Sequence, residues 1–161
     1  DYAEQMLCLA RYYHDALIAV ETNYSRYPVR VLRRKYGYTN LYVREREDGQ
    51  TGARERVDGF ETTARTKPII IAELAEEMRR DPAAESDPET LREMAVFLRH
   101  PDGRLAAASG AHDDLVMALA IAHHASAQGA RTWQPLAPVT SDPLARCFTP
   151  DERPDGAFIE W

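Results

Sequence analysis

The feature that most constrains the fold is one long apolar run that begins with two acids. In GAHDDLVMALAIAHH, residues 110–124, eight consecutive residues from Leu115 to Ala122 carry no polar side chain. A helix that is apolar all round is buried in a protein interior. A chain of 161 residues is long enough to build one domain with a core around such a helix. Gly129 predicts the end of this helix.

Two adjacent carboxylates, Asp113 and Asp114, stand at the start of this helix. One acid in a first turn gains about 0.3–1 kcal/mol from the helix dipole. Two adjacent acids repel each other, and unpaired carboxylates near a packed interior are costly. Mg²⁺ is commonly held by one or two carboxylates together with substrate phosphates, and such an ion removes both problems. The pair is therefore interpreted as helix capping or as metal ligands, and the metal interpretation accounts for both acids.

A third acid, Glu21, follows the short apolar run LIAV, residues 17–20, which is typical of a strand buried on both faces. In open α/β sheets, ligands bind at the carboxyl ends of strands. Glu21 is therefore either an exposed loop acid or an acid that faces a cleft. His112 precedes the acid pair and either contacts phosphate or caps the helix, and its position favours the cap.

Apolar periodicity and breaker residues predict an α/β layered domain over residues 1–130 and a proline-rich extended tail over residues 131–161. The charged, glycine-containing residues 44–60 predict a long loop or a hairpin. The remaining expected elements are helices at 1–14, 28–36, 67–80 and 112–128, strands at 17–20, 41–43 and 104–108, and a helical segment at 88–98 whose end can switch to a strand.

Charge is distributed unevenly along the chain. Residues 26–67 contain nine Arg and two Lys against six acids, a net of +5, whereas the whole chain has a net charge of −6. This basic segment is interpreted as a phosphate-facing patch or as a solvated loop. No apolar run approaches the ~20 residues that a membrane span needs. The two cysteines, Cys8 and Cys147, give neither a disulfide framework nor a zinc pattern, which suits a reducing cytoplasm.

Two motifs in this order carry a family resemblance: LIAVETN at residues 17–23 and GAHDDLVMALAIA at residues 110–122. Between them, GFETT, KPIIIAEL and the turn PDGR add to the pattern. Together they resemble the nuclease domain of phage large terminase subunits, the DNA-packaging motors of tailed bacteriophages. The resemblance covers roughly residues 1–128.

The resemblance implies a ribonuclease H-like fold, with helices around a central mixed sheet, and an endonuclease that cuts concatemeric double-stranded DNA. It implies two divalent metal ions, Mg²⁺ or Mn²⁺, held by Glu21 at the second acidic motif and by Asp113 and Asp114 at the third. It also implies the portal and the small terminase subunit as partners, and the cytoplasm of a bacterial host. The residues expected to contact DNA are Arg26, Arg44, Arg46, Arg54, Arg56, Lys67 and His112.

Two departures from the family pattern matter. Arg26 stands where the family often has a glycine, so the turn geometry is expected to differ there and the arginine is expected to add a phosphate contact. The family's first acidic motif is an Asp on an upstream strand, whereas only twenty residues precede Glu21. The first strands, their Asp and the preceding ATPase domain are therefore expected to be missing. We expect slow DNA cleavage or none, and self-association through an exposed strand edge at residues 17–20.

Two other functions stay open from the sequence. One is a catalytically silent DNA-binding or portal-docking module of the same fold. The other is a different ribonuclease H-like nuclease, such as a resolvase or a transposase. A GxxxxGK[ST] motif upstream in the parent gene would favour the terminase.

Overall fold

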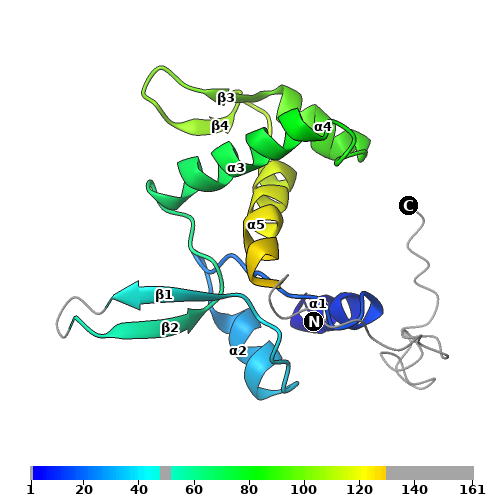
Figure 1. Ribbon diagram of the computed structural model, residues 1–161, viewed down its shortest axis with the longest axis vertical. Helices are drawn as coiled ribbons and strands as arrows, with labels where there is room; N and C mark the ends of the chain where they lie inside the picture. The colour runs from blue at the N-terminus through cyan, green and yellow to red at the C-terminus, as the bar shows by residue number, and fades with distance from the viewer. Residues whose placement is uncertain (1, 48–51, 130–161) are drawn as a thin grey trace.

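The structure is a computed structural model that describes residues 2–47 and 52–129. The predicted tail at 131–161 and Cys147 lie outside the described residues. In the described part, the chain has a mixed α/β architecture with five helices and two small antiparallel sheets (Figure 1). The elements in chain order are α1 (Tyr2–Tyr12), α2 (Tyr27–Arg34), β1 (Val43–Glu47), β2 (Arg54–Asp58), α3 (Thr66–Arg80), α4 (Pro88–Ala95), β3 (Phe97–Arg99), β4 (Leu105–Ala107) and α5 (Asp114–Gly129).

The predicted helices are confirmed, with ends that differ by a few residues. Pro28 lies in the first turn of α2, where its missing N–H costs nothing. The helical segment that starts at Pro88 does switch to a strand, because α4 ends at Ala95 and β3 follows at Phe97. The charged residues after Tyr42 form the β1–β2 hairpin, one of the two forms expected there.

The run LIAV is extended but pairs only at single positions. Ile18 pairs in parallel with Leu41, and Glu21 pairs in parallel with Phe60. The β1–β2 hairpin is inserted between these two pairings, so both contacts lie along one edge of the 17–22 segment. The strands expected at 17–20 and 41–43 are thus isolated bridges. Neither described sheet has more than two strands, so the central mixed sheet of a ribonuclease H-like fold remains a prediction.

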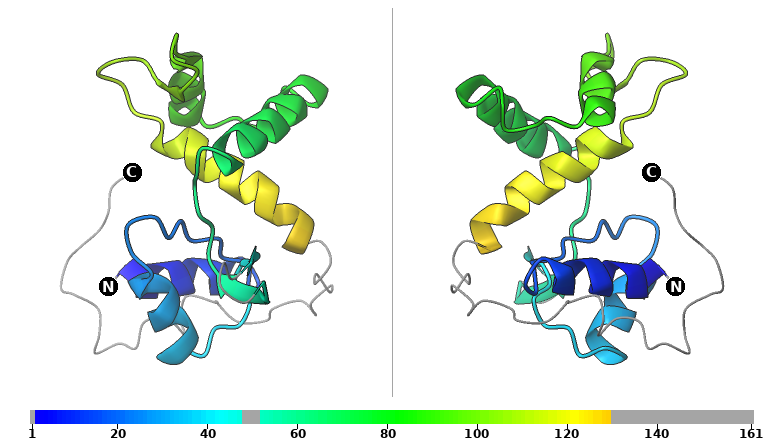
Figure 2. Two further views of the ribbon diagram at one scale, coloured as in Figure 1. Left: turned by 90° about the vertical axis from the view of Figure 1, so that its left-hand side faces the viewer. Right: turned by 90° about the vertical axis from the view of Figure 1, so that its right-hand side faces the viewer.

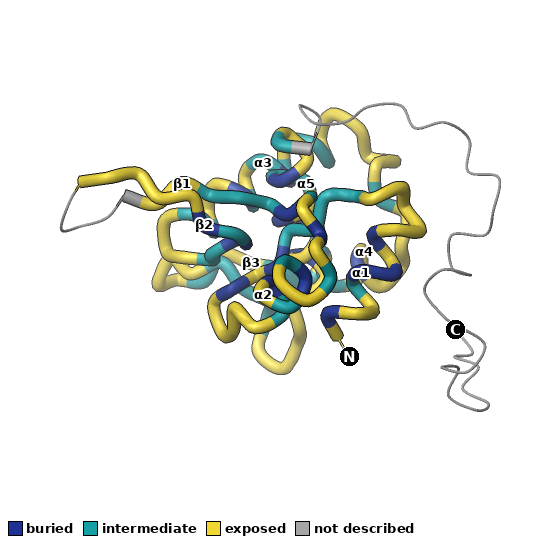
Figure 3. Tube along the Cα trace, turned by 90° about the horizontal axis from the view of Figure 1, so that it is seen from below, coloured by how far each residue is buried: buried dark blue, intermediate teal, exposed yellow. Residues whose placement is uncertain are grey.

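Two hydrophobic clusters organise the fold. The first lies between α1 and α2, where Leu7, Leu32 and Leu41 are buried. The second lies between α3 and α5, where Ile70 and Ala120 are buried. In Figure 2, α3 crosses α5, which explains why the second cluster is built mainly from these two helices. Figure 3 shows buried segments at the centre of the molecule and an exposed hairpin arm projecting from it.

The expectation that α5 is buried all round is wrong. Val116, Met117 and Ile121 are buried, but Ala118 and Ala122 are exposed. The reason is that α3 and α4 cover only one side of α5. Leu115, Ala118 and Ala122 lie on the uncovered side, and hydropathy alone does not separate the two sides. No helix in the described ranges combines the length and the apolar character that crossing a membrane requires.

Candidate functional site

A cleft of about 1620 Å³ runs between the 17–23 segment and the uncovered side of α5. Four of the residues singled out from the sequence line this one cleft: Glu21, Lys67, Asp113 and Asp114. Glu21 comes from the extended segment, Lys67 from the first turn of α3, and the two aspartates from the start of α5. The structure therefore places the two acidic motifs along one cleft although 92 positions separate Glu21 from Asp113.

Glu21 is held in the cleft wall by the two residues that follow it. Thr22 donates from its backbone N and from its hydroxyl to the carbonyl oxygen of Phe60, each at 2.8 Å. The Asn23 amide nitrogen donates to the Thr62 carbonyl at 2.6 Å, and the Thr62 N–H donates back to the Asn23 side-chain oxygen at 2.8 Å. These reciprocal bonds join the ETN motif to the GFETT motif and fix the backbone at Glu21.

Gly59 allows this close approach. Its φ is +92°, a region that side chains with a Cβ rarely adopt. A Cβ at this position would lie 3.0 Å from the Val20 carbonyl oxygen and in collision with the Thr22 methyl group. A glycine is therefore required at the start of GFETT for both conformational and steric reasons.

The start of α3 places Lys67. The Thr63 hydroxyl accepts from the Thr66 N–H at 3.0 Å and from the Arg65 N–H at 3.2 Å, which satisfies free donors at the helix start. In the first turn, Lys67 Nζ lies 3.1 Å from Asp113 Oδ2, and each side chain is about a quarter exposed. The sequence predicted both residues but not this ion pair.

The start of α5 is capped by an acid from another helix. Glu93 Oε2 accepts from the Leu115 N–H at 2.7 Å and from the Val116 N–H at 3.3 Å. The expectation that His112 caps this helix is wrong, because Glu93 takes the first N–H groups and His112 is exposed. With capping supplied by Glu93, the carboxylates of Asp113 and Asp114 are left for other partners.

A local cap at the start of α4 supports the helix that carries Glu93. Asp87 accepts from the Thr90 N–H at 2.7 Å and from the Thr90 hydroxyl at 2.8 Å. These hydrogen bonds to the ionised carboxylate hold the pKa of Asp87 below its ordinary value. Thr90 is buried, so this cap joins the helix start to the protein interior.

The donor set in the cleft fits a hard cation by its chemistry, since carboxylate oxygens are the ligands of Mg²⁺ and Mn²⁺. Glu21, Asp113 and Asp114 supply these oxygens from both walls. Within the described ranges, however, no three His, Cys, Asp or Glu side chains lie close enough together to form a metal site. Lys67 also holds one of the three carboxylates. The three acids therefore supply the ligand type that a divalent cation prefers, but they do not form a preassembled three-ligand site.

The hairpin arginines do not form one face. Successive side chains of a strand point to opposite faces. The register, in which Arg46 opposes Glu55 and Glu45 opposes Arg56, therefore puts Arg44 and Arg46 on one face and Arg54 and Arg56 on the other.

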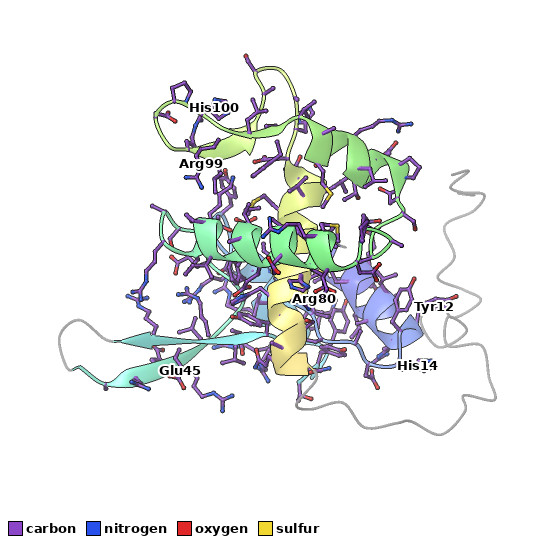
Figure 4. The ribbon with its side chains drawn as sticks, turned by 45° about the horizontal axis from the view of Figure 1, so that its top comes forward. Tyr12, His14, Glu45, Arg80, Arg99 and His100 are labelled. Carbon is purple, nitrogen blue, oxygen red and sulfur yellow. The ribbon has the colours of Figure 1, made fainter. Side chains whose placement is uncertain are left out.

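Acids on and beside the hairpin also pair with these arginines. Arg44 pairs with Glu61 at 2.5 Å, and Arg54 pairs with Glu45 at 3.3 Å. Figure 4 labels Glu45 on the exposed hairpin. Arg26 lies outside the hairpin, is exposed and directly precedes α2.

Sequence reasoning missed the positioning residues Asn23 and Glu93. Asn23 offers both a donor and an acceptor directly after a strand, a signal that is visible once the partner backbone is known. Glu93 carries no local signal, because its partners lie 22 and 23 positions away. A comparison with models of known families and with curated proteins gave no match. The function is therefore argued from the cleft and from the motif resemblance.

Proposed function

We propose that this chain is a metal-dependent endonuclease domain of a phage DNA-packaging terminase, with a ribonuclease H-like fold, that hydrolyses phosphodiester bonds of double-stranded DNA. The observation that carries the proposal is the convergence of Glu21, Asp113 and Asp114 on one cleft. The parallel pairing of residue 18 with 41 and of residue 21 with 60 supports the fold. The cap from Glu93 supports the metal role, since it removes the need for acids at the start of α5.

The residues of the cleft have distinct roles in this proposal. Glu21, Asp113 and Asp114 would supply carboxylate oxygens to divalent cations, and such cations would supply Lewis acidity to the phosphodiester. Lys67, which is held beside Asp113, would neutralise charge on a phosphate oxygen once it is released from that carboxylate. The hydrogen bonds of Thr22 to Phe60 and of Asn23 to Thr62 keep the backbone at Glu21 in place.

The DNA path in this proposal includes Arg26, His112 and the hairpin residues Arg46 and Arg56, which are exposed. Arg44 and Arg54 contribute after exchange of their present carboxylate partners. The family resemblance supports concatemeric DNA, the portal and the small terminase subunit as partners. It also supports the cytoplasm of a bacterial host as the location.

The test is Mn²⁺ binding, followed by nicking of supercoiled plasmid in Mn²⁺. We expect Glu21→Gln and Asp113→Asn each to abolish Mn²⁺ binding, and the double variant to add almost nothing, because residues that act as a unit are non-additive. Asp102→Asn is the matched control, since Asp102 is an exposed acid in the turn between β3 and β4. Nicking should disappear with the first two variants and persist with the control.

The second candidate is a DNA-binding module of the same fold without nuclease activity. The observations that favour it are the Lys67–Asp113 ion pair and the incomplete ligand set of the described residues. In that case the lysine substitutes for a cation and stabilises the two helix starts. DNA binding that is indifferent to Mn²⁺, together with no nicking at any metal concentration, would favour this module over the nuclease.

A further inference from the structure

The excess positive charge of the basic segment lies in α2 and at its two ends, and not in the hairpin. Residues 44–67 carry six cations and six acids, so their charges cancel. Residues 26–43 carry five cations and no acid, which accounts for the whole excess of +5. The charge pattern that suggested a phosphate-facing hairpin therefore points to the helix before it.

Three of these cations form a stripe that begins at the residue before α2 and continues along one side of that helix. Arg26, Arg30 and Arg34 are exposed and recur every fourth residue, so each lies about 6 Å further along the helix axis than the one before. The buried residues of α2, Val29 and Leu32, face the first hydrophobic cluster and fix which side the stripe occupies. Within residues 2–47 and 52–129, these three guanidinium groups form no ion pair. We call them the α2 arginine stripe.

Arg33 shows what a paired arginine on this helix looks like. It is part-buried and forms a bidentate pair with Asp58 at the base of the hairpin, at 2.5 and 3.0 Å. This pair anchors α2 to β2 and uses one of the three arginines of the helix for structure. The stripe has no comparable role in holding the fold, because its three side chains point into solvent.

The stripe begins at the rim of the candidate cleft. Tyr24, Ser25 and Pro28 line the cleft, and Arg26 lies between them in sequence. Tyr24 and Tyr27 flank Arg26 and are exposed, by 101% and 55% respectively. Tyrosine hydroxyls and arginines are both common donors to nucleic-acid phosphates. A strand of DNA that enters the cleft thus meets a continuous surface of donors that leads onto α2.

We propose that the α2 arginine stripe binds the sugar–phosphate backbone of duplex DNA next to the part that enters the cleft. The choice of DNA as the partner rests on the proposed function. Each phosphate of one strand occupies about 3.4 Å of the duplex axis, so arginines about 6 Å apart can contact different phosphates of the backbone. Contacts of this kind position the duplex without reading its sequence.

The test measures duplex binding by fluorescence anisotropy at several salt concentrations, with a chelator present so that no cleavage occurs. The variant carries Arg26→Gln, Arg30→Gln and Arg34→Gln. The plot of log affinity against log salt should become less steep by about 2 to 3, since each phosphate contact contributes about 0.9 to the slope. The matched control removes the same charge elsewhere, through Arg79→Gln, Arg80→Gln and Arg99→Gln. Figure 4 labels Arg80 on α3 and Arg99 at the end of β3.

The control triple should leave the slope nearly unchanged, and the stripe changed to three lysines should keep it, because lysine retains the charge. Equal effects of the two glutamine triples would overturn the proposal, since only net charge would then matter. No effect of the stripe triple would also overturn it. Stripe-dependent binding to phosphatidylserine vesicles that exceeds binding to the duplex would assign the surface to membranes and overturn the DNA proposal.

These results separate the stripe from the nuclease proposal. Asp102→Asn should bind the duplex with the same salt slope as the unaltered chain, because Asp102 lies outside both the cleft and the stripe. A stripe effect without any Mn²⁺-dependent nicking would support the stripe and count against the nuclease. Nicking with no stripe effect would support the nuclease and overturn the stripe.

Discussion

The two walls of the cleft are built by different means. The wall that carries Glu21 is an extended segment held by backbone hydrogen bonds to Asn40, Tyr42 and Phe60. The wall that carries Lys67 and Asp113 consists of two helix starts, whose free N–H groups are satisfied by side chains. The first wall therefore depends on close backbone approach, and the second depends on individual polar side chains.

The carboxylates on the two walls also differ in their partners. Glu21 is exposed and forms no ion pair with any residue in the described ranges. Asp113 is part-buried and bound to Lys67. A cation that enters the cleft meets an available ligand on one wall and a competing ammonium group on the other. Under the proposed function, the helix-start wall would limit the affinity for a cation, and the extended wall would set the stability of the fold.

The largest expected effect comes from adding a side chain at Gly59, where the chain passes closest to the extended wall. Gly59→Ala should destabilise the protein by about 2–4 kcal/mol, because it adds a strained positive φ to a steric overlap with Thr22 and Val20. Gly103→Ala is the matched control, since Gly103 has a φ of +83° with nothing within 4 Å. Urea unfolding measures both variants. Equal losses would show that backbone strain alone matters and that the close approach does not.

The next effect concerns pH at the same wall. The Tyr38 hydroxyl donates to the Ala16 carbonyl at 2.5 Å, just before the extended segment. Burial raises the pKa of Tyr38 to about 12. In the unfolded chain, the Tyr38 hydroxyl loses its proton near pH 10. The stability that the protonated hydroxyl contributes is therefore fully present below pH 10 and is lost as the pH rises toward 12. The loss amounts to at most about 2.7 kcal/mol, from two pKa units.

Tyr38→Phe should flatten this alkaline decrease in Tm, because phenylalanine has no proton to lose. Tyr13→Phe is the control, since Tyr13 is 61% exposed. Thermal melts across the alkaline range compare both variants with the unaltered chain. The assignment fails if Tyr13→Phe flattens the curve as much as Tyr38→Phe does.

The sequence predicted what is local in this molecule. Helix α3 was predicted because Ile70, Ile71 and Leu74 recur at helical spacing. In the structure Ile70 and Leu74 are buried. Glu21 was identified because it ends an apolar run, and Asp113 because it starts one. Each of these inferences uses residues within a turn or two of each other, where periodicity and breakers carry information.

What the sequence did not predict depends on contacts between distant segments. The Lys67–Asp113 pair spans 46 positions, and the clamp from Asn23 to Thr62 spans 39. No spacing rule predicts either contact. Similarly, the exposure of Ala118 depends on which side of α5 its neighbours leave open, and an alanine fits either environment.

A third prediction sharpens the contrast between the two carboxylates. Lys67→Met removes the ammonium that competes for Asp113 while keeping an apolar chain of similar length. If a cation binds both walls, Mn²⁺ affinity should rise about tenfold, equivalent to about 1.4 kcal/mol. Lys35→Met is the control, because Lys35 lies beside Tyr36 and outside the cleft. Titration calorimetry measures both. Weaker Mn²⁺ binding by Lys67→Met would show that the lysine orients Asp113 and does not compete with the cation.

The smallest expected effect tests the helix-start wall through Glu93, which touches neither DNA nor a cation in this proposal. Glu93→Ala should cost about 1 kcal/mol of stability, as loss of a helix cap does, and water limits the cost because the stronger bond, to the Leu115 N–H, is exposed. Glu93→Gln keeps an acceptor oxygen and should recover part of the loss. Because the cap sets the position of Asp113, Mn²⁺ affinity should fall with Glu93→Ala. Glu89→Ala, an exposed acid on the same helix, should leave that affinity unchanged. If Glu93→Ala alters stability but not Mn²⁺ binding, the start of α5 does not depend on its cap, and the two walls are more alike than their contacts indicate.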